Sequence, residues 1–278
     1  MRNGIYVVAT PIGNIADVSD RAKTVLSEVS VIACEDTRVT KKLLSLLNIS
    51  LKKEFISLHN FNENEQADKL IELAQKGLAV AQVSDAGTPL ISDPGYKLAQ
   101  KCRDAGVYLT VVPGPCALIC ALQLSGLPTD KFMFAGFVPN KEKARLDLFK
   151  TLKNVPGTLI FYETAPRLLK TLDAAAKVFG NRQVAVAREI TKLYEECRRG
   201  TAAALAEHFA ATEPKGEIVF MVAPPEETAT DIDFIPELRR LLAEVSLKSA
   251  VKAVVEKYDL NKNDVYETAL RIKNEQQV

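Results

Sequence analysis

The sequence lacks the patterns that mark several large classes of protein. It contains no apolar run of about 18 residues, and its short apolar start is too brief for a signal peptide. The five cysteines are odd in number and form no CxxC pair, which argues against a disulfide framework or a zinc site. The two histidines form no cluster, and the net charge of +1 does not draw the chain to nucleic acid or membrane. We therefore expect a cytoplasmic protein with no metal site and no membrane contact.

The two common glycine motifs that hold nucleotide phosphates are also missing. Neither GxxxxGKS/T nor GxGxxG occurs in the chain. What is present is an ordinary globular composition, with 47% hydrophobic and 26% charged residues. At 278 residues, the chain has room for one large or two ordinary domains and for a sizeable core.

Segments typical of strands and helices alternate along the first half of the chain. The apolar runs predict buried parallel strands at 4–9, 29–34, 78–83 and 107–112. Segments of helical spacing lie between and after them, at 20–29, 40–49, 63–77, 95–106 and 115–126. This alternation predicts an α/β fold built on a parallel sheet.

The pattern changes after residue 126. Strands are predicted at 132–137, 158–162, 183–188 and 217–223, with helices between them at 143–152, 165–180 and 201–210. The acidic, proline-led segment 224–233 resembles a linker, and three helices are predicted after it, at 238–244, 246–258 and 263–272. We therefore predict an N-terminal α/β domain (1–117), a C-terminal α/β domain (118–225), and a linker with a helical extension (226–278).

Three turns rich in glycine and proline follow predicted strands. SDAGTPLISDPG (84–95) follows one strand, and ATPIGN (9–14) and PGP (113–115) follow two others. In open α/β sheets, ligands bind at the carboxyl ends of the strands, where these turns would converge. The alternative for each turn alone is an ordinary chain reversal. Three of them at one edge favour a ligand site.

The charges of the 84–95 segment narrow the class of ligand. It carries Asp85 and Asp93 but no lysine or arginine, so it would repel a phosphate group. A carboxylate suits ribose hydroxyls or an ammonium group instead. S-adenosylmethionine offers both, together with a sulfonium cation and no phosphate. We therefore consider an adenosyl ligand without phosphates.

A set of motifs standing in order connects the chain to a known family. The motifs are VATPIGN (8–14), ACEDTR (33–38), VSDAGTPLISDPG (83–95), PGPCA (113–117), SGLPTD (125–130), GFVPNK (136–141), LIFYE (159–163), VAREITKLYEE (186–196), RRGT (198–201) and GEIV (216–219). Together they closely resemble the bacterial ribosomal RNA small-subunit methyltransferase I family, which has a tetrapyrrole-methylase-like fold. The resemblance covers nearly all of 4–223, and 236–272 is similar to the family's C-terminal helical extension.

The resemblance implies a two-domain α/β methyltransferase that holds S-adenosylmethionine in the cleft between its domains. It further implies methylation of the ribose 2′-hydroxyl of a cytidine in the decoding region of 16S rRNA, on the assembled small subunit, by a homodimer. One departure is visible. Where the family typically has YESPHR, this chain has YETAPR (162–167), which keeps Arg167 but lacks the histidine. A catalytic role of that histidine would not apply here.

The resemblance also implies cofactor-binding residues. Asp85, Gly87 and Thr88 match the family's cofactor loop, Pro11 is expected to line the cleft, and Tyr162 and Ile218 to flank the adenine. Cys116 and Ala117 begin a helix whose first amides can take the methionine carboxylate. The alternative for Asp85 is a turn cap, and for Tyr162 and Ile218 it is strand core.

A base would help the ribose hydroxyl, which is a poor nucleophile. The candidates are Glu35 and Asp36 in ACEDTR and Glu163 in LIFYE, and the sequence does not rank them. Glu189 and Lys192 in VAREITKLYEE are further candidates. Arg38 beside the first two could hold a phosphate or carboxylate, or form a structural pair with Asp36.

RNA contacts are predicted less sharply. Phe61 and Phe137 could stack a splayed base, with core packing as the alternative for Phe137. The lysine-containing C-terminal helices form a hypothetical RNA grip. Two other functions stay open: methylation of a porphyrin-like small molecule on the same fold, and a ribosome-binding factor without catalysis.

Overall fold

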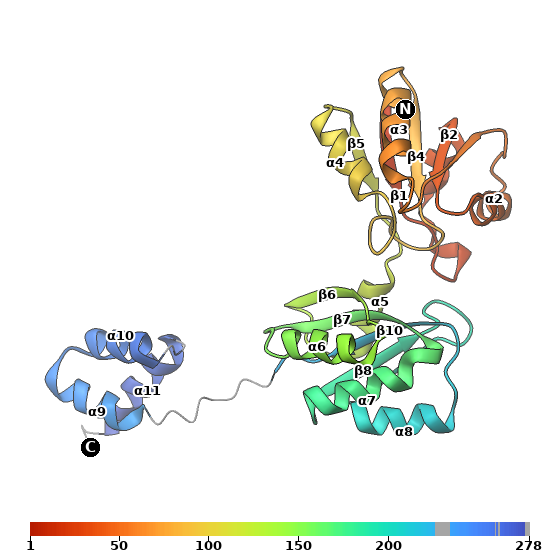
Figure 1. Cartoon of the computed structure of the whole chain (residues 1–278). Coiled ribbons are helices and arrows are strands. Elements are labelled where there is room, and N and C mark those ends of the chain that lie inside the picture. The colour runs from red at the N-terminus through yellow and green to blue at the C-terminus, as the bar shows by residue number, and fades with distance from the viewer. Residues whose placement is uncertain (226–233, 259, 261, 276–278) are drawn as a thin grey trace. The chain divides into compact units, whose positions relative to one another are not determined.

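The computed structural model describes residues 1–225, 234–258, 260 and 262–275. They fall into two compact units, 1–225 and 226–278, each with its own core (Figure 1). The first unit contains two five-stranded sheets, and the second contains helices alone among its described residues. Each unit is described separately below.

The first sheet is entirely parallel. Its strand order is β3-β2-β4-β1-β5, from β1 (Gly4–Val8), β2 (Val31–Cys34), β3 (Glu54–Ser57), β4 (Ala79–Val83) and β5 (Leu109–Val112). One apolar cluster joins it to α1 (Asp20–Glu28) and α2 (Thr37–Leu46), and another to α3 (Glu63–Gln75) and α4 (Tyr96–Asp104). A short 3₁₀ helix, η1 (Ile15–Asp17), precedes α1. Both faces of the sheet are thus covered, as its continuous apolar strands predict.

Two details of this sheet differ from the prediction. Helix α2 begins at Thr37, earlier than predicted, because the Asp36 carboxylate accepts the Arg38 backbone N–H at 2.8 Å and caps the helix. Strand β3 was missed. It is a four-residue edge strand of sequence EFIS with one fully buried side chain, so it lacks a long apolar run.

The second sheet is mixed. Its order is β6-β7-β10-β8-β9, from β6 (Phe132–Phe137), β7 (Thr158–Thr164), β8 (Gln183–Arg188), β9 (Glu196–Thr201) and β10 (Glu217–Val222). Only the β6–β7 pair is parallel. An apolar cluster joins this sheet to α6 (Glu142–Leu152), α7 (Leu168–Phe179) and α8 (Ala202–Ala211), and the 3₁₀ helix η2 (Ala165–Arg167) leads into α7.

Strand β9, of sequence ECRRGT, was also missed by the strand pattern. It is an edge strand that pairs only with β8, and edge strands commonly carry charges that block pairing with other chains. Such a strand has no alternating apolar pattern to detect.

Helix α5 (Ala117–Ser125) follows the first sheet in the chain but packs on the second. Leu118, Ala121 and Leu122 join a cluster with Ile160 and Met221 of that sheet. The chain therefore passes from one sheet to the other at the PGP turn. We keep a division between 1–117 and 118–225 as a proposal.

The second unit consists of three helices around a small core. Helices α9 (Ile235–Glu244), α10 (Leu247–Tyr258) and α11 (Lys262–Glu275) correspond to the predicted extension. Their buried residues are Leu238, Ala250, Val251, Val254, Val265, Ala269 and Ile272. Most of the predicted linker, 226–233, lies outside the described residues.

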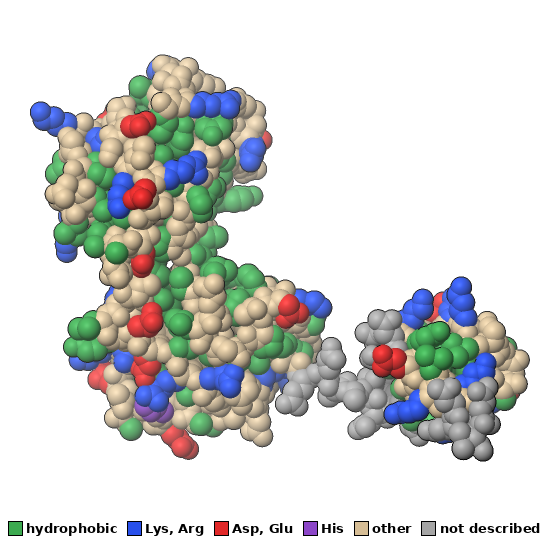
Figure 2. All heavy atoms as spheres, turned by 180° about the vertical axis from the view of Figure 1, so that it is seen from behind, with side chains coloured by type: hydrophobic (Ala, Val, Ile, Leu, Met, Phe, Trp, Pro, Cys, Tyr) green, Lys and Arg blue, Asp and Glu red, His purple; other side chains and the backbone are tan. Residues whose placement is uncertain are grey.

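Charges of both signs are mixed on the surface. On the face in Figure 2, lysine and arginine side chains are interspersed with aspartate and glutamate, in keeping with the net charge of +1. No helix in the described part of the chain is long and apolar enough to cross a membrane.

Candidate functional site

The three glycine- and proline-rich turns meet at the carboxyl edge of the first sheet. Thr10 N–H donates to the Gly87 carbonyl at 2.8 Å, and Gly87 N–H donates back to Thr10 at 3.1 Å. The Thr88 hydroxyl donates to the Pro115 carbonyl at 2.9 Å. These bonds join the turns after β1, β4 and β5, so the predicted convergence is confirmed.

The turn after β4 is held in an unusual backbone conformation. Gly87 has φ +82°, and a Cβ there would lie 3.1 Å from Ile12 Cγ2, which favours glycine. Leu90 and Ser92 also have positive φ, +72° and +66°. Such conformations persist where the surrounding structure enforces them, and they are frequent at ligand sites.

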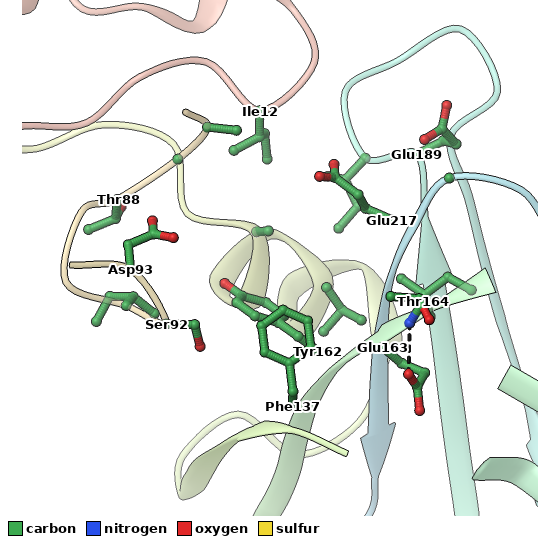
Figure 3. Close-up of a pocket in the computed structure, with 18 of the residues that line it drawn as sticks. Ile12, Thr88, Ser92, Asp93, Phe137, Tyr162, Glu163, Thr164, Glu189 and Glu217 are labelled. Atoms are coloured by element: carbon green, nitrogen blue, oxygen red, sulfur yellow. Dashed lines mark hydrogen bonds between the residues drawn. The ribbon is translucent and has the colours of Figure 1, made fainter. Parts of the chain in front are cut away.

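A cavity of about 490 Å³ opens beside these turns (Figure 3). This volume is in the usual range for a small-molecule site. Its wall comes from loops of the first sheet and from strands and loops of the second. The lining residues are Ile12, Glu35, Ala86, Gly87, Thr88, Ile91, Ser92, Asp93, Ala117, Phe137, Tyr162, Glu163, Thr164, Glu189, Ile190, Lys192, Gly216, Glu217, Ile218 and Val219.

Two carboxylates reach the cavity from the first sheet. Burial raises the pKa of Asp93 to about 6, and the nearby Glu35 and Asp85 carboxylates contribute to that rise. Partial burial likewise raises the pKa of Glu35, and the Asp85 charge contributes there too. The Glu35 carboxylate accepts no hydrogen bond from any residue that the structure describes. It is therefore available to a substrate.

On the opposite wall, the second sheet contributes an ion-paired group. Lys192 Nζ lies 2.9 Å from Glu189 Oε1 and 3.4 Å from Glu217 Oε2. Gly216 adjoins this group with φ +84°, and a Cβ there would lie 2.0 Å from Glu189 Oε1. Carboxylates outnumber cations around the cavity, which suits a cationic ligand better than a phosphate.

Aromatic rings form a third part of the wall. The Tyr162 ring meets Phe134 edge-on at 4.8 Å and Phe137 at 5.5 Å between ring centroids. Burial raises the pKa of the Tyr162 hydroxyl, while a backbone hydrogen bond from Leu118 at the start of α5 opposes that rise. Phe137 is half exposed and lines the cavity, so core packing does not account for it.

Most of the predicted cofactor residues line this cavity. They are Gly87, Thr88, Ala117, Tyr162 and Ile218. Pro11 and Cys116 do not line it themselves, but their neighbours Ile12 and Ala117 do. Asp85 is not among the lining residues. Its Oδ1 accepts the Asp36 backbone N–H at 3.0 Å and links the turn after β4 to the turn after β2.

Glu163 lines the cavity, but its carboxylate is fully buried among protein donors. Its Oε1 accepts the Thr164 N–H at 2.8 Å and lies 3.1 Å from Arg167 Nε, and its Oε2 accepts the Thr171 hydroxyl. Figure 3 shows this carboxylate turned away from Tyr162 and Asp93. Arg167 also donates to the Val138 carbonyl, so it links β7 to the turn after β6.

Asp36 and Arg38 form a pair outside the cavity lining. Arg38 Nη2 lies 2.6 Å from Asp36 Oδ2, and its hydrogen bonds lower the pKa of Asp36 to about 2. The Arg38 side chain is otherwise exposed, at 89% of its surface. This geometry matches the structural Asp36–Arg38 pair, which was one of the two alternatives that the sequence left open. Asp36 also caps α2.

Sequence reasoning missed part of the site. Asp93 was noted in the 84–95 segment but given no role, and Ile12, Glu217 and Thr164 were not considered. The signal for Asp93 was its place in a rigid turn after a strand. Glu217 stands in the GEIV motif but was given no role, because its place at the cavity depends on the pairing of β10 with β7 and β8.

Two family models match the chain. The model of Tetrapyrrole (Corrin/Porphyrin) Methylases matches residues 4–206, and the model of the RsmI C-terminal HTH domain matches residues 232–273. The two matches together cover both compact units. They confirm the predicted fold class, a tetrapyrrole-methylase-like α/β fold with a helical extension.

Curated relatives are similar over nearly the whole chain. A protein of Erythrobacter litoralis, named ribosomal RNA small subunit methyltransferase I, is 49% identical over 97% of this chain and 95% of its own. Proteins of the same name from Mesorhizobium japonicum and Escherichia coli O157:H7 are 44% and 42% identical, over 97% and 96% of this chain and 92% and 94% of their own.

Solved structures share the fold at low sequence identity. Diphthine synthase has a TM-score of 0.61 at 13% identity, covering 79% of this chain and 89% of its own. Uroporphyrin-III C-methyltransferase of Thermus thermophilus, complexed with S-adenyl homocysteine, has a TM-score of 0.54 at 18% identity, covering 79% of this chain and 97% of its own. At these identities the likeness concerns the fold alone.

Proposed function

Because this chain belongs to the ribosomal RNA small subunit methyltransferase I family, we propose that it methylates the ribose 2′-hydroxyl of a cytidine in the decoding region of 16S rRNA. The observation that carries the proposal is the near-full-length similarity, at 41–49% identity, to proteins named for small-subunit rRNA. The ordered motifs, through the family that they resemble, support a ribose 2′-hydroxyl as the methyl acceptor and a cytidine as the target nucleotide. The substrate in this proposal is the assembled small subunit.

Membership of the family makes the chain a methyltransferase, with S-adenosylmethionine as its methyl donor. The methyltransferase activity and the use of S-adenosylmethionine were both predicted from the sequence, and both predictions are confirmed. When bound, this cofactor supplies a methyl group on a cationic sulfur. The residues of this chain bind the cofactor, position the acceptor and remove its proton.

The cavity suits that cofactor on its own chemistry. It joins an apolar and aromatic wall to several carboxylates, and the described lining has no lysine-bearing glycine loop for phosphate. We propose that the Gly87–Thr88 backbone, Ala117, Tyr162 and Ile218 hold the adenosyl and methionine parts. Asp85 then acts indirectly, by fixing the turn on which Gly87 and Thr88 lie.

Glu35 is the base that the geometry favours. It lines the cavity, accepts no hydrogen bond from the described residues, and has a raised pKa, so it can take the proton that the ribose hydroxyl loses. Asp36 is held ionised by Arg38, and its low pKa makes it a weak base. Glu163 already accepts two hydrogen bonds and is paired with Arg167. We therefore propose structural roles for Asp36, Arg38 and Glu163, with Asp93 as the second candidate base.

We also propose that the protein is a homodimer that works in the cytoplasm, where small subunits are found. Partly exposed apolar side chains on α5 and β6 support an interface between two copies: Ile119, Leu124, Phe132 and Met133. Light scattering coupled to size-exclusion chromatography would distinguish a dimer from a monomer.

The test of the proposed reaction is transfer of labelled methyl groups to small subunits purified from cells that lack this modification. Nuclease mapping then locates the label. We expect one labelled cytidine in the decoding region, resistant to alkaline cleavage because its 2′-oxygen is blocked. Measurable cofactor binding without label in RNA would contradict the proposal and direct the search to small-molecule acceptors. Label in naked 16S rRNA but not in subunits would contradict only the proposal that the assembled small subunit is the substrate.

A further inference from the structure

Two turns carry large apolar side chains that are strongly exposed to solvent. Among the residues that the structure describes, these side chains are Phe61, Leu193 and Tyr194, exposed at 99%, 88% and 70%. Phe61 lies on turn 59–62, which connects β3 to α3, and the other two lie on turn 189–195, between β8 and β9. Single exposed apolar side chains are common on protein surfaces, so what distinguishes these is how the two turns are built and their place beside the cavity.

Turn 59–62 is fixed by its own hydrogen bonds. The Asn62 side chain accepts the His59 N–H and donates to the Ser57 carbonyl, both at 2.9 Å. The Asn62 backbone N–H also donates to the His59 carbonyl at 3.1 Å. The Phe61 ring meets the His59 ring edge-on, with 6.1 Å between centroids. The Phe61 side chain therefore projects into solvent from a turn whose backbone is fixed by hydrogen bonds.

Turn 189–195 is fixed in a similar way. Lys192 N–H donates to the Glu189 carbonyl at 3.0 Å, and Glu195 N–H donates to the Lys192 carbonyl at 3.1 Å. The Glu195 carboxylate accepts the Thr191 N–H at 2.7 Å. Leu193 and Tyr194 lie at the tip of this closed turn.

Turn 189–195 forms part of the cavity wall, and turn 59–62 is linked to a residue of that wall. The Ser57 hydroxyl donates to the Glu35 carbonyl at 3.4 Å, and the His59 charge lowers the pKa of Glu35 against the rise caused by burial. His59 is thus near the cavity carboxylate, two residues before Phe61. On the other turn, Lys192 lines the cavity and immediately precedes Leu193 and Tyr194.

The charges of the cavity decide which part of an RNA these turns can hold. Carboxylates outnumber cations in the lining, so phosphate groups are not attracted there. A nucleotide that reaches the cavity must leave its stack, and its neighbours lose stacking partners. Exposed aromatic rings replace that stacking. Rings held in advance on rigid turns lose little entropy on binding.

We propose that Phe61 and Tyr194 stack on the nucleobases that flank the target nucleotide, one ring from each of the two turns. The proposal rests on the proposed function, since it takes single-stranded RNA of the small subunit as the substrate. In this arrangement the cavity holds only the target ribose and the cofactor. By stacking on the neighbouring bases, the two rings determine which ribose enters the cavity, without contacts to phosphate groups.

The test compares aromatic and non-aromatic variants in methyl transfer to unmodified small subunits. Phe61→Ala and Tyr194→Ala are each expected to lower kcat/KM about tenfold, mainly through KM, without changing the dissociation constant for S-adenosylmethionine. Phe61→Trp and Tyr194→Phe should retain near wild-type values, whereas Phe61→Leu should not. Leu46→Ala is the matched control, because Leu46 is 61% exposed at the far end of α2.

Three outcomes would overturn the inference. Alanine variants within twofold of wild type would show that the rings do not contact substrate. Full activity of Phe61→Leu would indicate an apolar contact with a ribosomal protein instead of base stacking. An equal loss of cofactor affinity would indicate a structural role. Failure of the wild type to label small subunits contradicts the proposed function itself and is distinguishable, because no variant is then needed.

Discussion

At the scale of single residues, the carboxylates around the cavity differ mainly in their hydrogen-bond partners. Glu35 accepts no hydrogen bond from the described residues, and Asp36 is paired with Arg38. Glu163 accepts two hydrogen bonds and forms an ion pair with Arg167. A paired or capped carboxylate is stabilised in its charged form and is a weak base. Carboxylates therefore differ in their chemistry even at the neighbouring positions Glu35 and Asp36.

Replacement of Glu35 by glutamine tests its role as the base. We expect Glu35→Gln to lower kcat by roughly 10²–10⁴-fold with little change in cofactor affinity, because the amide cannot take a proton. Single-turnover methyl transfer across pH is the measurement. Glu54→Gln is the control, an exposed glutamate at the amino end of β3 that pairs with Lys69. Equal effects of the two substitutions would remove Glu35 from the reaction.

Asp93 makes stability depend on pH. Its pKa in the fold, about 6, is above the ordinary value of 3.8, so the folded protein holds this proton more tightly than the unfolded chain. Its stabilising contribution is therefore full below about pH 4 and is lost as pH rises to about 6. We expect Asp93→Asn to be more stable than wild type at pH 7.5 by about 1 kcal/mol after allowance for solvent screening, and not at pH 4. Urea unfolding at both pH values would show this, and a pH-independent difference would contradict it.

At the scale of elements, ion pairs and glycines hold the cavity wall in place. Glu163 on β7 binds Thr171 of α7 and Arg167 of η2. We expect Glu163→Ala to cost about 3–5 kcal/mol of unfolding free energy, because it leaves buried donors unpaired. Glu142→Ala breaks the exposed pair with Lys177 and should cost under about 1 kcal/mol. Urea denaturation compares them, and a large loss of kcat with unchanged stability would instead restore Glu163 as a catalytic candidate.

Two glycines with positive φ separate backbone strain from a steric effect on the cavity. Gly216 has φ +84° with Glu189 Oε1 in the space of a Cβ, whereas Gly180 has φ +61° and nothing within 4 Å. We expect Gly180→Ala and Gly216→Ala each to destabilise by about 1 kcal/mol. Only Gly216→Ala should also weaken cofactor binding, because Glu189 must move away from Lys192. Calorimetric titration with S-adenosylmethionine measures this, and equal affinities would exclude Glu189 from the binding wall.

At the scale of the whole molecule, the two compact units have separate hydrophobic cores. The apolar clusters of 1–225 and that of the helical unit share no residue. Residues 1–225 should therefore fold without the helices, and keep cofactor affinity.

A protein ending at Pro225 tests the helices as an RNA grip. We expect its kcat/KM for small subunits to fall at least about tenfold, because a second tethered contact is lost. Circular dichroism and methyl transfer are the measurements. Unchanged binding to small subunits would remove the RNA role of the helices, and failure of residues 1–225 to fold would contradict their independence.

The sequence alone determined the class of fold, most helices and buried strands, and the turns that meet at one sheet edge. These follow from local periodicity, capping and turn chemistry, which depend on residues near each other in the chain. Only the tertiary structure decided which carboxylate is free. Glu35, Asp36 and Glu163 were equal candidates until their partners were known, and those of Glu163 come from β7, η2 and α7 together. The charged edge strand β9, the contribution of Glu217 and the exposed Tyr194 likewise depend on pairing and burial, which no local pattern records.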